Sequence, residues 1–407
     1  MLEKFWSLIS LNLLPTLPVA PRFWSIFALM AFCFLPSYIA YAKQSVRRRS
    51  IYRFCVFLAL LFYVCVFVKI EDFYFDRGTI TVFAKTLYAL TFAFAAFDAR
   101  DGRAGAAKKP FFKEFVSHPL ESFSAHFLYY IFKLLPMKTA SNLGASCGRF
   151  AGVLSRRYSR LADENIKIAF PKKTPEARAE MAKAMWEMLG RYCAEPSHFS
   201  DFYRESEKYL TFVNDKILDR LKGRPFVAFI SHAGSVGLIS IPFAKHGATC
   251  SIIYKYPSNN LTANLATRSF GRGIGRLKFI PNNAHGTKEA IGVLKSGGAI
   301  LATPDQKFLT GAPTKFFGRK VLSPIGVAKL AGHFHCPLLP IQISREEGLK
   351  HRIIFHEPFM PYYDQNGEAD DIRTMQRVND TIEKWVRENP EQWFWVHDRF
   401  GIKESLK

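Results

Sequence analysis

The sequence predicts an α/β fold, a mixed sheet flanked by helices, preceded by an N-terminal region of transmembrane helices. Two observations predict it. From residue 224 onward strand-like and helix-like stretches alternate. Before residue 98, three apolar stretches reach roughly the 20 residues that a membrane-spanning helix needs. Half of the 407 residues (49%) are hydrophobic, which argues against disorder.

The three apolar stretches are residues 23–41, 54–68 and 80–97, and the third contains Lys85. The opening segment, residues 5–19, is broken by Pro15 and Pro18 and fits a short interfacial helix better than a cleaved signal peptide. Basic residues are concentrated between the first and second apolar stretches, and more of them follow residue 97. Since basic loops stay in the cytoplasm, we expect a multi-pass membrane protein whose remaining chain is cytoplasmic. The alternative is buried helices of a soluble domain.

The predicted organisation has three parts. Residues 1–97 form the membrane-anchoring region with about three transmembrane helices, residues 98–114 a basic linker, and residues 115–407 one α/β domain. The domain opens with helices. Residues 123–136 are amphipathic, and residues 141–161 either lie along a membrane surface or pack in the core with a basic outer face. Thr174 followed by Pro175 is typical of a helix N-cap.

The rest of the domain alternates between strand-like and helix-like stretches. The predicted strands are residues 226–231, 250–256, 278–281, 299–303, 337–344 and 352–356. The predicted helices are residues 236–246, 261–270, 287–296, 325–334 and 372–388, the last stopped by Asn389 and Pro390.

Composition limits the partners and cofactors. The net charge of +22 favours anionic partners, and the apolar N-terminus favours an anionic membrane lipid among them. No zinc spacing, aromatic-plus-basic motif or helix-turn-helix pattern indicates nucleic acid. The seven cysteines form no CxxC pair, and the cluster of His333, His335 and Cys336 lacks a second ligand pair. We expect no disulfide, no metal and no cofactor.

His232 is the first candidate for chemistry. It follows the apolar strand in FVAFISHAGSVGL, residues 226–238, at the edge where ligands bind to open α/β sheets. Gly234 permits a tight turn, and the N–H groups of Gly234, Ser235 and Val236 would begin the next helix, where they suit a developing oxyanion. A histidine there can serve as general base for a hydroxyl. From the residues alone, a structural histidine is the simpler interpretation.

Several stretches together resemble one family. The run ISHAGSVGLISIPFAKHG resembles the signature of the bacterial lipid A late acyltransferases, of the lysophospholipid acyltransferase-like superfamily. The resemblance extends in order through NIKIAFP, MLGRYCAE, ATPDQKFLTGAPTKFFGRK, CPLLPIQISR and NPEQWFWVHDRF, over roughly residues 118–400. It implies a glycerolipid acyltransferase-like fold. It also implies transfer of a fatty acyl chain from acyl carrier protein, or from CoA, to a hydroxyl of a lipid A precursor or related glycolipid, with His232 as general base.

The resemblance also suggests further site residues. It places Arg268 near a phosphate of the acceptor or thioester, and Asp305 with Gln306 in the site; the alternatives are a surface arginine and a strand-end turn. Lys255 and Arg345 end strands and could bind anionic groups. Phe316, Phe317 and Gly318 fit a packed turn. GRGIGR, residues 271–276, lacks the spacing of a phosphate loop.

One position departs from the family. Its members carry an acidic residue five positions after the histidine, and this sequence has Gly237 there. No Asp or Glu occurs between residues 224 and 288. Three interpretations stay open. A distant carboxylate, first of all Asp305, could orient the imidazole; the acceptor could hold it; or the chain could be a catalytically silent relative that binds lipid or partner proteins.

Overall fold

The computed structural model describes residues 118–255, 265, 277–308 and 310–402. The predicted transmembrane stretches, the interfacial segment, the linker, the helix at 261–270 except residue 265, and the loop at 271–276 lie outside the described residues. Within those residues, no helix is both long and apolar enough to cross a membrane. The chain divides into two units, residues 1–128 with 257–265 and residues 129–256 with 266–407, and the second carries the sheet.

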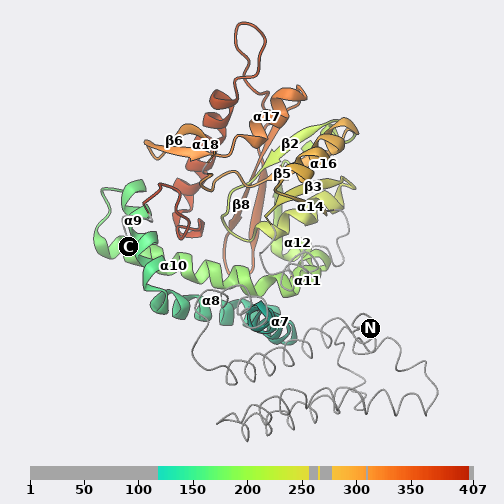
Figure 1. Cartoon of the computed structure of the whole chain (residues 1–407). Coiled ribbons are helices and arrows are strands. Elements are labelled where there is room, and N and C mark those ends of the chain that lie inside the picture. The colour runs from blue at the N-terminus through green and yellow to red at the C-terminus, as the bar shows by residue number, and fades with distance from the viewer. Residues whose placement is uncertain (1–117, 256–264, 266–276, 309, 403–407) are drawn as a thin grey trace, which may run out of the picture. The chain divides into compact units, whose positions relative to one another are not determined.

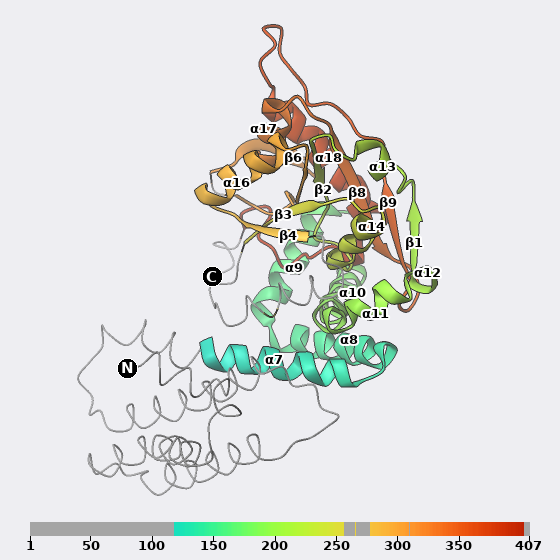
Figure 2. The same cartoon turned by 90° about the vertical axis from the view of Figure 1, so that its right-hand side faces the viewer.

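A mixed seven-stranded sheet organises this second unit, in the order β1-β9-β8-β2-β5-β3-β4 (Figures 1 and 2). All neighbouring strands are parallel except β8 and β9. The strands are β1 (Leu210–Val213), β2 (Phe226–Phe229), β3 (Cys250–Tyr254), β4 (Leu277–Pro281), β5 (Ala299–Ala302), β8 (Leu338–Arg345) and β9 (His351–Phe355). The hairpin of β6 (Ala312–Phe316) and β7 (Arg319–Ser323) stands apart from the sheet.

Helices cover both faces of the sheet, so the strands at its centre read as continuous apolar runs. Val227 and Phe229 of β2 belong to one hydrophobic cluster, while Phe226 and Ala228 belong to the other. The first cluster includes residues of α16 (Ala284–Lys295), α17 (Gly326–His333) and α18 (Asp371–Glu388). The second includes residues of α11 (Phe199–Arg204), α13 (Ile217–Leu221) and α14 (Ser240–Lys245).

The helices before the sheet are α7 (His118–Leu134), α8 (Met137–Leu154), α9 (Arg156–Ala169) and α10 (Pro175–Ala194). The short helices η3 (Glu195–His198) and α12 (Ser206–Tyr209) come after them. The predicted cap of α10 is confirmed, because the Thr174 side chain accepts the N–H of Ala177 at 3.3 Å.

Helix α8 has two different faces. Its small residues press against α10: a Cβ added at Gly148 would lie 2.1 Å from the carbonyl oxygen of Trp186. Its other face leaves large apolar side chains in solvent, with Phe150 65% and Leu154 66% exposed. The packing interpretation of residues 141–161 is confirmed for α8, which packs through its glycines and has exposed Arg149 on its outer face, while the membrane-surface interpretation stays a prediction.

The predicted strands agree with β2, β3, β4, β5, β8 and β9 to within two residues at each end. The sequence did not predict β1 or the β6–β7 hairpin. Helix α16 begins at Ala284, three residues earlier than predicted, because Asn283 caps it through the N–H of Gly286 at 3.0 Å. The packed turn is confirmed, since Phe317 and Gly318 join β6 to β7 with φ of 50° and 72°.

Candidate active site

His232 and Asp305 meet because their strands are parallel neighbours. Phe229 of β2 pairs with Ala302 of β5, and each functional residue lies three positions further along its own strand direction. Two parallel strands end at the same edge of a sheet, so both side chains reach the same place. The register of β2 and β5 thus brings a carboxylate to the histidine across 73 residues of chain.

The Asp305 carboxylate makes three contacts around the histidine. Its Oδ1 lies 2.6 Å from His232 Nδ1, and its Oδ2 accepts the backbone N–H of His232 at 2.7 Å and the indole N–H of Trp393 at 2.8 Å. Asp305 is 1% exposed. Burial alone would raise the pKa of this carboxyl, but the charge and hydrogen bonds of His232 and the Trp393 bond hold it well below its usual value. The carboxylate therefore stays ionised and fixes the imidazole ring.

Gln306 contacts the opposite side of the ring. Its Nε2 lies 3.0 Å from His232 Nε2 and 2.8 Å from His397 Nε2. With the amide in this orientation both bonds are donated by Gln306, so both imidazole Nε2 atoms act as acceptors. The proton of His232 is then on Nδ1, facing Asp305, and the Nε2 lone pair is the basic one. Burial is the main cause that lowers the pKa of His397 to about 4, which keeps this second ring neutral.

The loop that carries His232 is tied to the C-terminal segment. The N–H of Gly234 donates to the carbonyl of Gln392 at 3.2 Å, and the N–H of Phe394 donates to the carbonyl of His232 at 3.2 Å. Gly234 has a φ of 62°, a conformation that favours glycine. This corrects the expectation that the Gly234 N–H serves an oxyanion, because the protein already uses it. The helix predicted at residues 236–246 is a 3-10 helix, η4 (Val236–Ile239), which contains the buried Gly237 and continues directly into α14.

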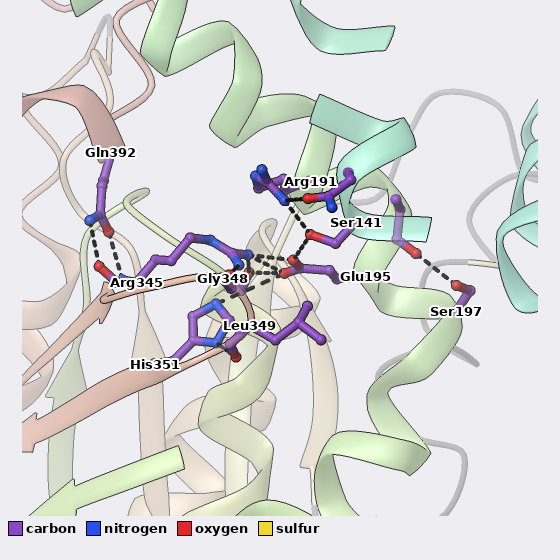
Figure 3. A network of polar contacts seen from close by, with 12 residues as sticks. Ser141, Arg191, Glu195, Ser197, Arg345, Gly348, Leu349, His351 and Gln392 are labelled. Carbon is purple, nitrogen blue, oxygen red and sulfur yellow. Dashed lines mark hydrogen bonds and ion pairs between the residues drawn. The ribbon is translucent and has the colours of Figure 1, made fainter. Parts of the chain in front are cut away.

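Ser235 and Arg345 lie in a buried network rather than at the imidazole. Ser235 Oγ donates to Glu195 Oε2 at 2.6 Å, and Arg345 Nη2 contacts both oxygens of Glu195 at 2.5 Å (Figure 3). Arg345 is 8% exposed. Ser235 Oγ and both Nη atoms of Arg345 are therefore engaged inside the protein, which gives the predicted substrate-binding role of these two side chains no support. Lys255 is exposed just after β3, and Arg268 lies outside the described residues.

Sequence reasoning missed four contributors from the C-terminal segment: Gln392, Trp393, His397 and Arg399. Trp393 and Trp395 are both buried in the core, and Trp393 also donates to Asp305. Arg399 donates to the carbonyls of Gln306 and Leu322, each at 3.1 Å, so it fixes the backbone beside the site. The run QWFWVHDRF could have indicated these contributors, because it places polar side chains among aromatic residues that are typical of a core.

A cavity of about 930 Å³ lies between α16 and α17. Its lining is mixed and includes Ile253, Phe308, Lys329, Leu330 and Tyr363. None of the described predicted site residues lines it, although Phe308 follows Gln306 by two positions. Across residues 118–255, 277–308 and 310–402, no three His, Cys, Asp or Glu side chains gather in a way that could hold a metal ion.

Comparison with known proteins places this site in a family context. The family model for the bacterial lipid A biosynthesis acyltransferases matches residues 110–401. The lipid A biosynthesis palmitoleoyltransferase of Escherichia coli (strain K12) is 26% identical over 286 residues, which covers 66% of this chain and 87% of that protein. The myristoyltransferase of lipid A biosynthesis from the same organism is 25% identical over 276 residues, covering 65% and 81%. A lipid A biosynthesis acyltransferase of Haemophilus influenzae is 21% identical over 282 residues, covering 66% and 84%.

Proposed function

The chain belongs to the bacterial lipid A biosynthesis acyltransferase family, and from that premise we propose that it transfers a fatty acyl chain from a thioester to a hydroxyl of a lipid A precursor or related glycolipid. The donor is acyl carrier protein or, as the second choice, acyl-CoA. The observation that carries the proposal is the contact of 2.6 Å between Asp305 and His232 Nδ1, which leaves Nε2 as the basic nitrogen.

In the proposed reaction, the acceptor hydroxyl takes the place of the Gln306 amide at His232 Nε2. The imidazole removes the hydroxyl proton as the oxygen attacks the thioester carbonyl. The tetrahedral oxyanion collapses, the carbon–sulfur bond breaks, and the imidazolium returns its proton to the leaving sulfur. Asp305 stabilises the transient imidazolium.

The second candidate, a catalytically silent relative, rested on Gly237. That position lacks the acidic residue which holds the histidine elsewhere in the family. Here Asp305 contacts both Nδ1 and the backbone N–H of His232, so an orienting carboxylate is present from another strand. This geometry supports the active enzyme over the silent relative.

The acceptor is tested by mass spectrometry of lipids from a strain lacking this gene. We expect one lipid A species to lose the mass of a single acyl chain, and expression of the wild-type chain, but not of His232→Ala, to restore it. If the lipid A profile is unchanged and another lipid loses an acyl chain, that other lipid is the acceptor. No change in any lipid would contradict acyl transfer in the cell.

We further propose that the protein works on the cytoplasmic face of the bacterial inner membrane, with α8 and the start of α9 against the lipid. Phe150, Val153 and Leu154 are exposed there, beside exposed Arg156 and Arg157. Residues 137–162 contain no Asp or Glu. A surface that combines apolar and basic side chains suits anionic headgroups over acyl chains.

Vesicles that contain a photoreactive lipid test this surface with the full chain. Peptides from residues 149–158 should take up more label than the exposed loop at residues 364–368, and more on anionic than on neutral vesicles. Equal labelling of the two segments would count against a lipid-facing α8.

A further inference from the structure

A second carboxylate, Glu195, lies at the centre of a buried polar network. It begins η3 directly after α10 and is 1% exposed. Ser141 Oγ donates to its Oε1 at 2.7 Å, and Ser235 Oγ donates to its Oε2 at 2.6 Å. Arg345 Nη2 contacts both oxygens at 2.5 Å, while Arg345 Nη1 donates to the carbonyl of Gly348. Figure 3 shows Arg345 and Ser141 reaching Glu195 from different elements.

The network contains one full ion pair. Burial alone would raise the pKa of Glu195, but Arg345, the neighbouring His351 and the hydrogen bonds hold it below its ordinary value. Burial, and then the charge of Arg345, lowers the pKa of His351 to about 4, so this ring is neutral near pH 7. A buried ion pair is weak evidence for stability, because desolvation offsets much of its attraction. What such a pair does supply is a fixed geometry for the segments that it joins.

Glu195 reaches the His232 loop by two routes. The direct one is Ser235, three residues after His232. The other runs through Arg345, whose backbone N–H and carbonyl are both bonded to the side chain of Gln392, at 2.8 Å and 2.9 Å. The carbonyl of Gln392 then accepts the N–H of Gly234 at 3.2 Å. Both routes begin at one carboxylate and end within three residues of His232.

We propose that Glu195 is a positioning residue for the acyl transfer: through Ser235 and through Arg345 with Gln392, it holds the His232 loop where the imidazole meets Asp305. The inference rests on the proposed function of His232. Asp305 fixes the ring from the side of β5, and Glu195 fixes the loop backbone from the side of α10. Mispositioning of a reacting group by about 1 Å can cost about 100-fold in rate, so both anchors matter to the rate.

The two serines on Glu195 provide a matched pair of variants. Ser235→Ala and Ser141→Ala each remove one hydroxyl from the same carboxylate, but only Ser235 belongs to the His232 loop. We expect similar decreases in melting temperature. Ser235→Ala should lower kcat about tenfold with KM unchanged, whereas Ser141→Ala should stay within about twofold of wild type. Ser235→Thr keeps the hydroxyl and should recover most of kcat.

A second measurement does not need turnover. Diethyl pyrocarbonate modifies accessible neutral imidazoles, and mass spectrometry can follow His232 alone. Ser235→Ala should change the modification rate of His232 about threefold, the effect expected of one lost hydrogen bond, and Ser141→Ala should not.

The possible outcomes distinguish a failure of the positioning role of Glu195 from a failure of the proposed acyl transfer. An active wild type with equal kcat and equal His232 modification in both alanine variants would overturn the positioning role. An inactive wild type would contradict the proposed function, and the His232 modification rates would still decide whether Glu195 positions the loop.

Discussion

Asp305 contacts His232 at two points, the ring Nδ1 and the backbone N–H. The ring contact selects the tautomer in which Nε2 is unprotonated, and the backbone contact fixes the loop. Asp305 follows β5, the parallel neighbour of the strand that precedes His232. A carboxylate on the neighbouring strand can therefore supply the orienting charge that Gly237 does not.

Asp305→Asn should therefore decrease kcat by a large factor. An asparagine amide can donate to Nδ1 and so favours the tautomer with the proton on Nε2, which cannot act as a base. In a serine protease the equivalent change costs about 10⁴-fold in kcat, and we expect an effect of that order in a steady-state transfer assay. Gly237→Glu should give no increase in rate. A gain from Gly237→Glu, or full activity of Asp305→Asn, would show that the ring is oriented by another group.

At the scale of single elements, the sequence predicted the strands with dense apolar runs and missed those without them. Strand β2 is buried along its whole length, and the sequence FVAF shows it. Strand β6 has the sequence APTKF, which contains Pro313 and Lys315 and no apolar run, so it gives only a weak strand signal. Strand β1 has only four residues, and its partner strand, β9, lies far away in the sequence. Its local sequence therefore gives little indication of a strand.

The contact between α8 and α10 depends on glycines that face each other. A Cβ at Gly190 would lie 2.0 Å from the carbonyl oxygen of Gly144, whereas a Cβ at Gly292 of α16 meets nothing within 4 Å. Gly190→Ala should decrease the free energy of unfolding by about 1–3 kcal/mol, because the helices must separate. Gly292→Ala should be neutral or stabilise by up to about 1 kcal/mol, since alanine favours helix. Chemical denaturation of both variants measures the difference, and equal effects would contradict the close helix approach.

Across the whole molecule, the site combines segments that lie far apart in the chain. His232 and Asp305 could be predicted because each ends an apolar strand. The contribution of His397 and Arg399 could not, because it depends on how residues 390–400 fold back over the strand ends. The Glu195–Arg345 pair spans 150 residues, and no local pattern in either segment indicates the other.

The buried His351 and the half-buried His397 make the folded state sensitive to acid. The pKa values of His351 and His397 are both lowered to about 4, by burial first, while an unfolded histidine has a pKa of about 6.5. The unfolded chain therefore binds more protons as the pH falls from about 6.5 to about 4, and stability decreases over that range. Each histidine should cost roughly 2 kcal/mol at pH 5 relative to pH 7.

Denaturation of the full chain in detergent at the two pH values measures this loss. His351→Asn keeps a donor for the carbonyl of Leu349 but does not titrate, so it should reduce the difference by about half. The same free energy of unfolding at pH 7 and pH 5 would contradict neutral rings with lowered pKa values at both positions.

The central claim is that His232, held by Asp305, is the base for acyl transfer to a lipid hydroxyl. The most direct measurement compares purified membranes containing wild type with membranes containing His232→Ala, supplied with labelled acyl carrier protein thioester and an acyl-deficient lipid A precursor. Loss of a general base typically costs 10²–10⁴-fold, so the variant should transfer acyl chains at least about 100 times more slowly. Equal rates of transfer in the two membranes would contradict the account.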